Sequence, residues 1–180
     1  AFGYLAGQDL VAANNTLIGF EAGLQNTSGA DCTAVGYSAM GAGVTTGANN
    51  TVVGSRAGNT ITSGGYNTCI GSMAGEDMTD VSYNTYVGYH AGGDATNHSN
   101  TSIGALAGRY NTSVYNTDVG YLANGGGNGA GSLVCLGGRS GYSNTSGGDN
   151  NCYVGYHTGY YVTTGMHNVM LGNVAGVASG

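Results

Sequence analysis

A short motif of alternating polar and apolar positions recurs along the whole chain. The segment NTVVGSRAG at 50–58 returns as NTCIGSMAG at 67–75 and as NTYVGYHAG at 84–92. The first glycine of each motif, here called the marker glycine, occurs at Gly3, Gly19, Gly36, Gly54, Gly71, Gly88, Gly104, Gly120, Gly137, Gly155 and Gly172. Successive marker glycines lie 16 to 18 residues apart, so eleven copies fill residues 1–180 as a single repeat array and leave no room for a separate domain.

Two positions of the motif favour a β-strand because they hold β-branched or aliphatic residues. The residue before the marker glycine is aliphatic in all ten complete copies: Ile18, Val35, Val53, Ile70, Val87, Ile103, Val119, Leu136, Val154 and Leu171. The residue two places earlier is Thr in seven of these copies. Positions two apart share one face of a strand, and we expect this face to point inward. The residue between them varies freely, and we expect it to face outward.

Asparagine marks the start of the predicted strand. It lies four places before the marker glycine in eight of the ten complete copies: Asn15, Asn50, Asn67, Asn84, Asn100, Asn116, Asn151 and Asn168. Side-chain amides that stack one per repeat can hydrogen-bond along the array. We therefore expect a structural asparagine ladder.

The repeat length indicates one coil per motif. Seventeen residues are too few for two helices, and no helical periodicity is present. Two strands of about five residues and two turns fit this length, with each coil hydrogen-bonded to the next at a spacing of ~4.8 Å. The sequence therefore predicts an all-β fold, a β-solenoid (β-roll) of about eleven coils with a 16–18-residue repeat, forming a rod roughly 50 Å long.

Composition narrows the function. Charged residues make up only 7% of the chain, the net charge is −6, and there is no Lys, Pro or Trp. An acidic chain without a basic cluster is not expected to bind nucleic acid, and no apolar stretch is long enough to span a membrane. The four cysteines have no metal-site spacing, and we expect them to remain unpaired within the chain.

The pattern N-T-x-[V/I]-G-x-x-A-G, followed by T-[T/S]-G-x-x-N, resembles two groups of repeats. One is the head repeat of trimeric autotransporter adhesins, and the other is the Gly/Asn/Thr-rich repeat of phage tail-fibre-like proteins and bacterial surface fibres. The resemblance covers the whole chain. It implies a location outside the cell, at a cell or virion surface. The adhesin resemblance also implies a left-handed β-roll and a homotrimer.

No catalytic, cofactor-binding or metal-binding residues are predicted. His90 and His157 share a motif position but lie four coils apart, roughly 19 Å by strand spacing, so they cannot share a metal; we expect them at the surface. The acidic cluster Glu76, Asp77 and Asp80 matches no calcium loop. Aromatic residues follow six marker glycines and predict either a packed aromatic stripe or a sugar-binding platform: Tyr4, Phe20, Tyr37, Tyr89, Tyr121 and Tyr156.

Seven N-x-[S/T] sequons offer sites for covalent glycans. Asn26, Asn111 and Asn144 fall in predicted turns, and we expect them to be the most accessible. The other candidates are Asn14, Asn49, Asn97 and Asn100. Glycans would add solubility to a surface with few charges.

These observations favour a structural subunit or segment of an extracellular fibre or filament, built by coil stacking and without catalytic activity. The expected partner is the chain itself, in a head-to-tail filament or a homotrimer. The alternative is a receptor-binding or glycan-binding module, as an adhesin head or phage tail fibre. A third hypothesis, a surface-layer or ice-binding solenoid, requires a flat exposed array of Thr. It ranks last because the Thr column is assigned to the inward face.

Overall fold

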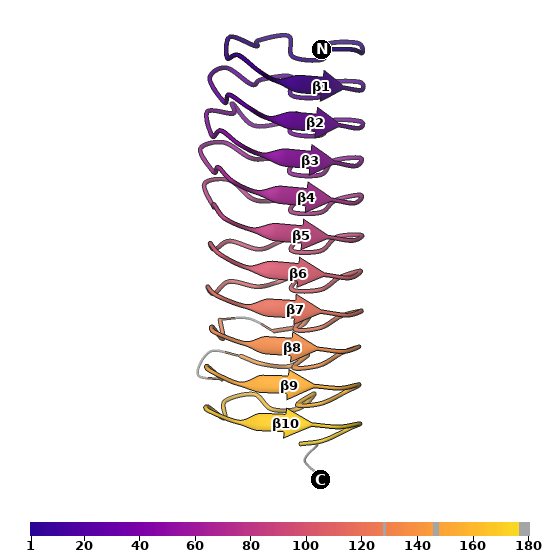
Figure 1. Cartoon of the computed structure of the whole chain (residues 1–180), viewed down its shortest axis with the longest axis vertical. Helices are drawn as coiled ribbons and strands as arrows, with labels where there is room; N and C mark the ends of the chain where they lie inside the picture. The colour runs from indigo at the N-terminus through magenta and orange to yellow at the C-terminus, as the bar shows by residue number, and fades with distance from the viewer. Residues whose placement is uncertain (128, 146–147, 177–180) are drawn as a thin grey trace.

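The protein is an all-β solenoid. The computed structural model describes residues 1–127, 129–145 and 148–176, and in these ranges one parallel sheet of ten strands runs in chain order along the rod (Figure 1). The strands are β1 (Thr16–Ile18), β2 (Thr33–Val35), β3 (Thr51–Val53), β4 (Thr68–Ile70), β5 (Thr85–Val87), β6 (Thr101–Ile103), β7 (Thr117–Val119), β8 (Val134–Leu136), β9 (Cys152–Val154) and β10 (Val169–Leu171). The predicted fold class and its 16–18-residue repeat are confirmed.

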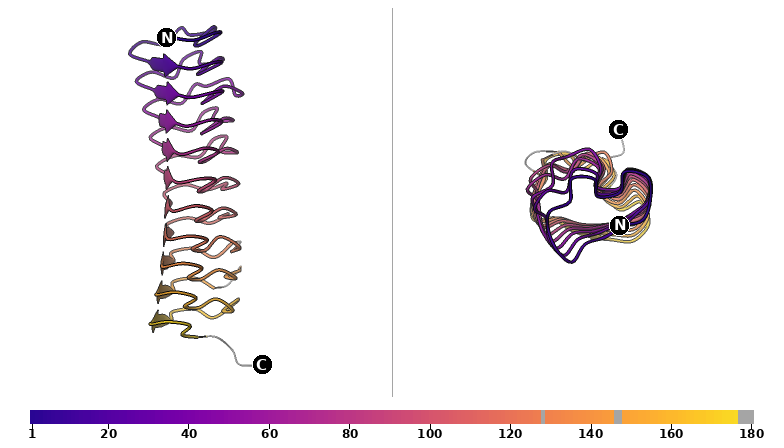
Figure 2. Two further views of the ribbon diagram at one scale, coloured as in Figure 1. Left: turned by 90° about the vertical axis from the view of Figure 1, so that its right-hand side faces the viewer. Right: turned by 90° about the horizontal axis from the view of Figure 1, so that it is seen from above.

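Every motif position stacks on the same position of the next coil. Thr51 of β3 pairs with Thr68 of β4, for example, and this register holds from β1 to β10. Ten strands in this order define nine full turns, and a bridge between Phe2 and Ile18 adds part of a further coil. The coil outlines superpose from above with a gradual rotation (Figure 2). The strands cross the near side from left to right as the chain descends, so the solenoid is left-handed (Figure 1).

The expected facing of the strands is wrong. In β1 to β9 the Thr position and the aliphatic position point outward, and the variable residue between them is the more deeply buried one. Each of these central residues of β1 to β9 is at most 1% exposed: Leu17, Ala34, Val52, Cys69, Tyr86, Ser102, Asp118, Cys135 and Tyr153. Val53 and Val87 are half-buried on the outside, and Ile70 is 40% exposed.

The asparagine position explains this facing. Asn lies four residues before the marker glycine and the variable residue lies two before it, so an extended chain places both on one face. Asn67 is buried because its amide hydrogen-bonds within the coil stack. The variable residue must therefore point inward with it, and the Thr and aliphatic positions must point outward.

Variation at the central strand position is compensated within each coil. Over Gly58, the side chains of Val52 and Ile61 both fill the space that a Cβ on this glycine would occupy. Cys69 and Met78 occupy the same place over Gly75 one coil later. In the following coil the large ring of Tyr86 covers Gly92, and the small Ala95 stands where the earlier coils have Ile61 and Met78. Close packing therefore tolerates different residues as long as the pair fills one volume.

Two apolar cores form, with a polar section between them. One cluster extends from Leu17 to Ala95, and the other from Ala123 to Tyr153. Between them the central strand positions hold Ser102 and Asp118, both fully buried. Polar residues at these two coils replace the apolar contacts that join the other coils.

Within the described ranges, each coil from β1 to β10 contains one three-residue strand, whereas two strands of about five residues were expected. The described remainder of these coils consists mainly of turns and bends, whose backbone amides still bond to the adjacent coil, as from Thr62 N to Thr79 O at 2.7 Å. The marker glycine ends the strand in a conformation that requires glycine. At Gly54 φ is +140°, and a Cβ there would lie 2.4 Å from the carbonyl oxygen of Gly71.

Candidate functional site

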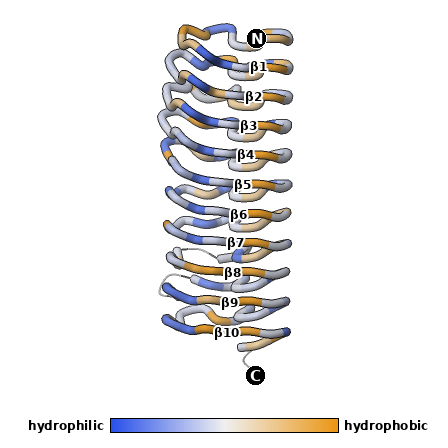
Figure 3. The backbone as a smooth tube through the Cα atoms, in the orientation of Figure 1, coloured by the Kyte–Doolittle hydropathy of each residue, from blue (hydrophilic) through white to orange (hydrophobic). Residues whose placement is uncertain are grey.

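The outward side of the sheet forms a regular two-column surface, here called the Thr/aliphatic face. One column contains Thr16, Thr33, Thr51, Thr68, Thr85, Thr101, Thr117, Val134, Cys152 and Val169. The other contains Ile18, Val35, Val53, Ile70, Val87, Ile103, Val119, Leu136, Val154 and Leu171. Neither column holds a charged residue, and the hydropathy colouring shows apolar strand ends repeating from coil to coil (Figure 3).

The threonines of this face differ in their bonding from the threonines of the turns. In the turns, the hydroxyl of Thr45 donates to Ile61 O at 3.0 Å and that of Thr62 donates to Thr79 O at 2.8 Å, so each joins two coils. Among the described residues, none of the seven strand threonines uses its hydroxyl in a hydrogen bond to another protein group. Their hydroxyls are therefore available to whatever meets this face.

Aromatic side chains lie beside the face in short stacks. Tyr4, Phe20 and Tyr37 follow successive marker glycines, and their ring centroids lie 5.3 and 5.5 Å apart. Tyr66 and Tyr83 precede the ladder asparagines of β4 and β5 and stack at 5.2 Å. All five rings are exposed. Of the six residues predicted to form a stripe, Tyr4, Phe20 and Tyr37 stack on one another, whereas Tyr89 and Tyr156 contact the adjacent histidines His90 and His157. The stack of Tyr66 and Tyr83 lies at a different motif position and was not predicted.

The asparagines of the predicted ladder join successive coils. Asn67 Nδ2 donates to Asn50 Oδ1 at 3.1 Å, and Asn84 Nδ2 donates to Asn67 Oδ1 at 3.2 Å. The same Asn67 amide also donates to Val81 O at 2.8 Å, across the coil. At the two coils that lack this asparagine, the preceding ladder oxygen keeps its bond from the backbone amide, that of Cys32 or of Leu133. The ladder thus bonds both along the rod and across it.

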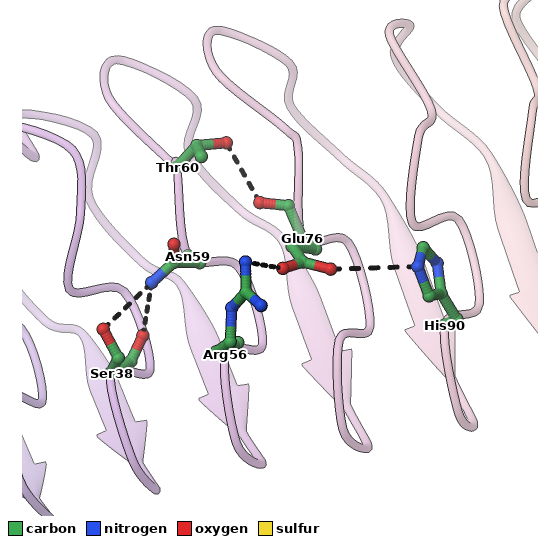
Figure 4. A network of polar contacts seen from close by, with 6 residues as sticks. All are labelled: Ser38, Arg56, Asn59, Thr60, Glu76 and His90. Carbon is green, nitrogen blue, oxygen red and sulfur yellow. Dashed lines mark hydrogen bonds and ion pairs between the residues drawn. The ribbon is translucent and has the colours of Figure 1, made fainter.

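Glu76 forms the centre of a polar network on another side of the rod (Figure 4). One carboxylate oxygen lies 2.5 Å from the Arg56 guanidinium, and the other lies 3.8 Å from His90 Nε2. Asn59 donates at 2.7 Å to the carbonyl oxygen of Ser38, which lies in the coil before that of Arg56. These contacts join the turns of neighbouring coils, so the network stabilises the stacking of coils.

The acidic and histidine clusters do not form a metal centre within the described ranges, where no group of three or more His, Cys, Asp and Glu residues is placed to hold a metal ion. The expectation that His90 lies at the surface is wrong, because its side chain is only 12% exposed beside Glu76. His157 is also half-buried, in contact with the rings of Tyr156 and Tyr160. Asp77 and Asp80 are exposed, whereas Glu76 is buried in its ion pair.

Asp118, at the central position of β7, is a buried carboxylate that no sequence motif marks. Its Oδ2 accepts long hydrogen bonds from Ser102, Asn111 and Asn124, at 3.4 to 3.5 Å. Its Oδ1 and the Asn124 Oδ1 are both buried without a hydrogen-bond partner. Burial raises the pKa of this carboxyl to about 7, although the neighbouring amides act in the opposite direction. Protonation of this carboxyl would remove the cost of holding a charge in the buried interior.

The sequons are not exposed in the expected order. Asn26, Asn111 and Asn144, expected to be the most accessible, are all buried. Their side chains point into the coil, where Asn26 closes a turn by donating to Gly29 O at 3.0 Å. Asn100 is buried in the ladder and Asn97 is half-buried, which leaves exposed Asn14 and Asn49 as the accessible candidates. Glycosylation at these two positions stays a prediction.

The four cysteines are free thiols, as expected, and Cys135 and Cys152 occupy opposite faces of adjacent strands.

The described part of the chain contains no pocket and no helix of the length and apolarity that a membrane crossing needs. The Thr/aliphatic face is thus the most regular surface that the fold presents. Comparison with protein families, with curated proteins and with solved structures finds no match for this chain.

Proposed function

We propose that this chain is a structural, non-catalytic segment of an extracellular fibre at a cell or virion surface. The observation that carries this proposal is the in-register stacking of ten strands with a buried asparagine ladder. Each coil presents to the next the same backbone groups and the same side-chain amides. A rod built in this way gains length with each coil while keeping one cross-section.

Self-association follows from the same geometry. A coil from a second copy that carries the motif can pair with a coil of the first through the hydrogen bonds that already join β3 to β4. Head-to-tail stacking would then give a filament, and lateral association of three rods would give a trimeric fibre. The expected partner in both assemblies is another copy of this chain.

Electron microscopy and sedimentation of the purified chain test this proposal. We expect rods of uniform width whose length grows with protein concentration, or trimers of fixed length. Gly54→Val should abolish them, because the new side chain would meet the Gly71 carbonyl oxygen and disrupt coil stacking. Ser63→Val, at an exposed turn position, is the matched control and should keep them. A compact monomer at all concentrations would contradict self-assembly.

A second candidate function, glycan binding, is favoured by the exposed aromatic stacks. Flat rings at regular intervals can pack against the apolar faces of sugar rings. A glycan array should show binding that Phe20→Ala and Tyr37→Ala remove together. Tyr115→Ala, at an exposed ring that contacts no other ring among the described residues, is the control and should leave binding unchanged. Absence of any glycan signal would exclude this candidate.

A further inference from the structure

The Thr/aliphatic face combines three properties that point to one class of ligand. It is regular in two dimensions, it is free of charge, and seven of its side chains carry hydroxyls that make no hydrogen bond within the described protein. We propose that this face binds the surface of ice. The proposal goes beyond the structural role and does not depend on it, because a single folded chain presents the whole face.

The spacing of the face suits a crystalline water surface. Successive strands lie ~4.8 Å apart along the rod, and the two columns lie roughly 6.6 Å apart across each strand. Water oxygens on the prism faces of hexagonal ice form a rectangular array with comparable repeats. Because every strand pairs with the next in the same register, the array continues without a phase shift from β1 to β10.

The side chains on the face are chemically suited to order water. Thr and Val present methyl groups, around which water forms cages, and each Thr adds a hydroxyl that can enter the hydrogen-bond network of those cages. β-branched side chains have few χ1 rotamers, so the methyl and hydroxyl positions are set before ice is met. Little conformational entropy is then lost on binding.

The free hydroxyls distinguish this ligand from an apolar protein partner. Covering the Thr column with an apolar surface would leave up to seven hydroxyls without partners, and burying an unpaired hydroxyl is unfavourable. An ice surface supplies a donor or an acceptor to each hydroxyl. The other sides of the rod do not offer such a match, because they consist of turns that include charged groups such as Arg56 and Asp94.

Thermal hysteresis and inhibition of ice recrystallisation by the full chain test the proposal. The face variant Thr68→Lys with Thr85→Lys places two charges at the centre of the array, on strands β4 and β5. The control is Thr96→Lys with Thr164→Lys, which adds the same charges at exposed turn positions. Circular dichroism checks that both variants remain folded.

We expect the wild-type chain and the control to be active, and the face variant to lose activity at least tenfold. A conservative variant, Thr68→Val with Thr85→Val, keeps the shape and should retain part of the activity even if the lysine variant unfolds. Absence of wild-type activity would overturn the proposal, and so would equal loss in the control. A wild-type dimer that only the face variant dissociates, without ice activity, would assign the face to a second copy instead. The ice assays do not bear on the fibre proposal, which microscopy tests separately.

Discussion

Asn67 lies directly between Asn50 and Asn84 and bonds to both. Its Nδ2 donates to Asn50 Oδ1 at 3.1 Å, and its Oδ1 accepts from the Asn84 backbone amide at 3.0 Å and from Asn84 Nδ2 at 3.2 Å. The same Nδ2 reaches Val81 O at 2.8 Å. One buried side chain therefore satisfies polar groups of three successive coils.

Replacing Asn67 should be strongly destabilising. Asn67→Leu keeps a similar volume but leaves the Asn84 amide, the Asn50 oxygen and the Val81 carbonyl with fewer partners. Each buried orphan costs about 1–3 kcal/mol, so we expect the free energy of unfolding to fall by at least about 3 kcal/mol. Urea denaturation followed by circular dichroism measures this change. Thr96→Leu, at an exposed turn, should change it by less than about 0.5 kcal/mol.

The buried Asp118 should make the protein less stable as pH rises. Its pKa is about 7 in the folded state and ~3.9 in an unfolded chain. The folded state therefore binds the proton more tightly, and this stabilisation is complete below pH 4 and is lost as pH rises through 7. The difference between the folded and unfolded pKa values of Asp118 corresponds to about 4 kcal/mol of free energy of unfolding.

Asp118→Asn removes this titration. The neutral amide has a similar shape and carries no charge that burial would penalise. We expect the variant to be more stable than the wild-type chain at pH 8, by several kcal/mol, and similar to it at pH 4. Calorimetric melting temperatures at both pH values test this expectation. Asp80→Asn, at an exposed carboxylate, is the control; if it flattened the pH profile equally, Asp118 would not be the cause.

The repeat could be predicted from the sequence because glycine conformation and strand pairing act at every copy. Its facing could not be predicted from hydrophobicity, because Val53 and Ile70 look like core residues and Asp118 looks like a surface residue. The informative feature is the spacing of Asn67 and Cys69, which lie two residues apart and therefore share one face of the strand. A buried amide ladder determines that face more strongly than the apolar column does, since an unpaired amide inside the protein is costly.

The candidate site depends on the same spacing. The ice-binding hypothesis requires that the side chains of Thr51 and Thr68 face outward, whereas the sequence prediction placed the Thr column inward and so disfavoured this hypothesis. Exposure of the sequons was also wrong, because Asn26 and Asn144 close turns with their own side chains and so point inward. The residues of a segment can predict a turn, but they do not show which side chain closes that turn with a hydrogen bond.

Core volume in adjacent coils should be interchangeable. Ala95→Met overpacks the coil that already holds the Tyr86 ring over Gly92, and we expect a loss of about 1–3 kcal/mol. Tyr86→Cys alone leaves a cavity and should cost about 3–5 kcal/mol. The double variant reproduces the Cys69–Met78 pair and should recover much of both losses. A double-mutant cycle by urea denaturation measures the coupling; strictly additive losses would contradict the paired packing.

Thiol reactivity should follow burial and facing. Desolvation raises the pKa of Cys69 to about 12 and also raises those of Cys32 and Cys135, so these three buried thiols hold little thiolate at pH 8. Cys152 lies half-exposed on the Thr/aliphatic face. We expect a maleimide to add once to the folded chain, at Cys152, and four times in denaturant, as read by intact mass and peptide mapping. Cys152→Ser should abolish the native adduct, whereas Cys135→Ser should not; rapid native labelling of Cys135 would mean that the strand faces outward, as the apolar column first suggested.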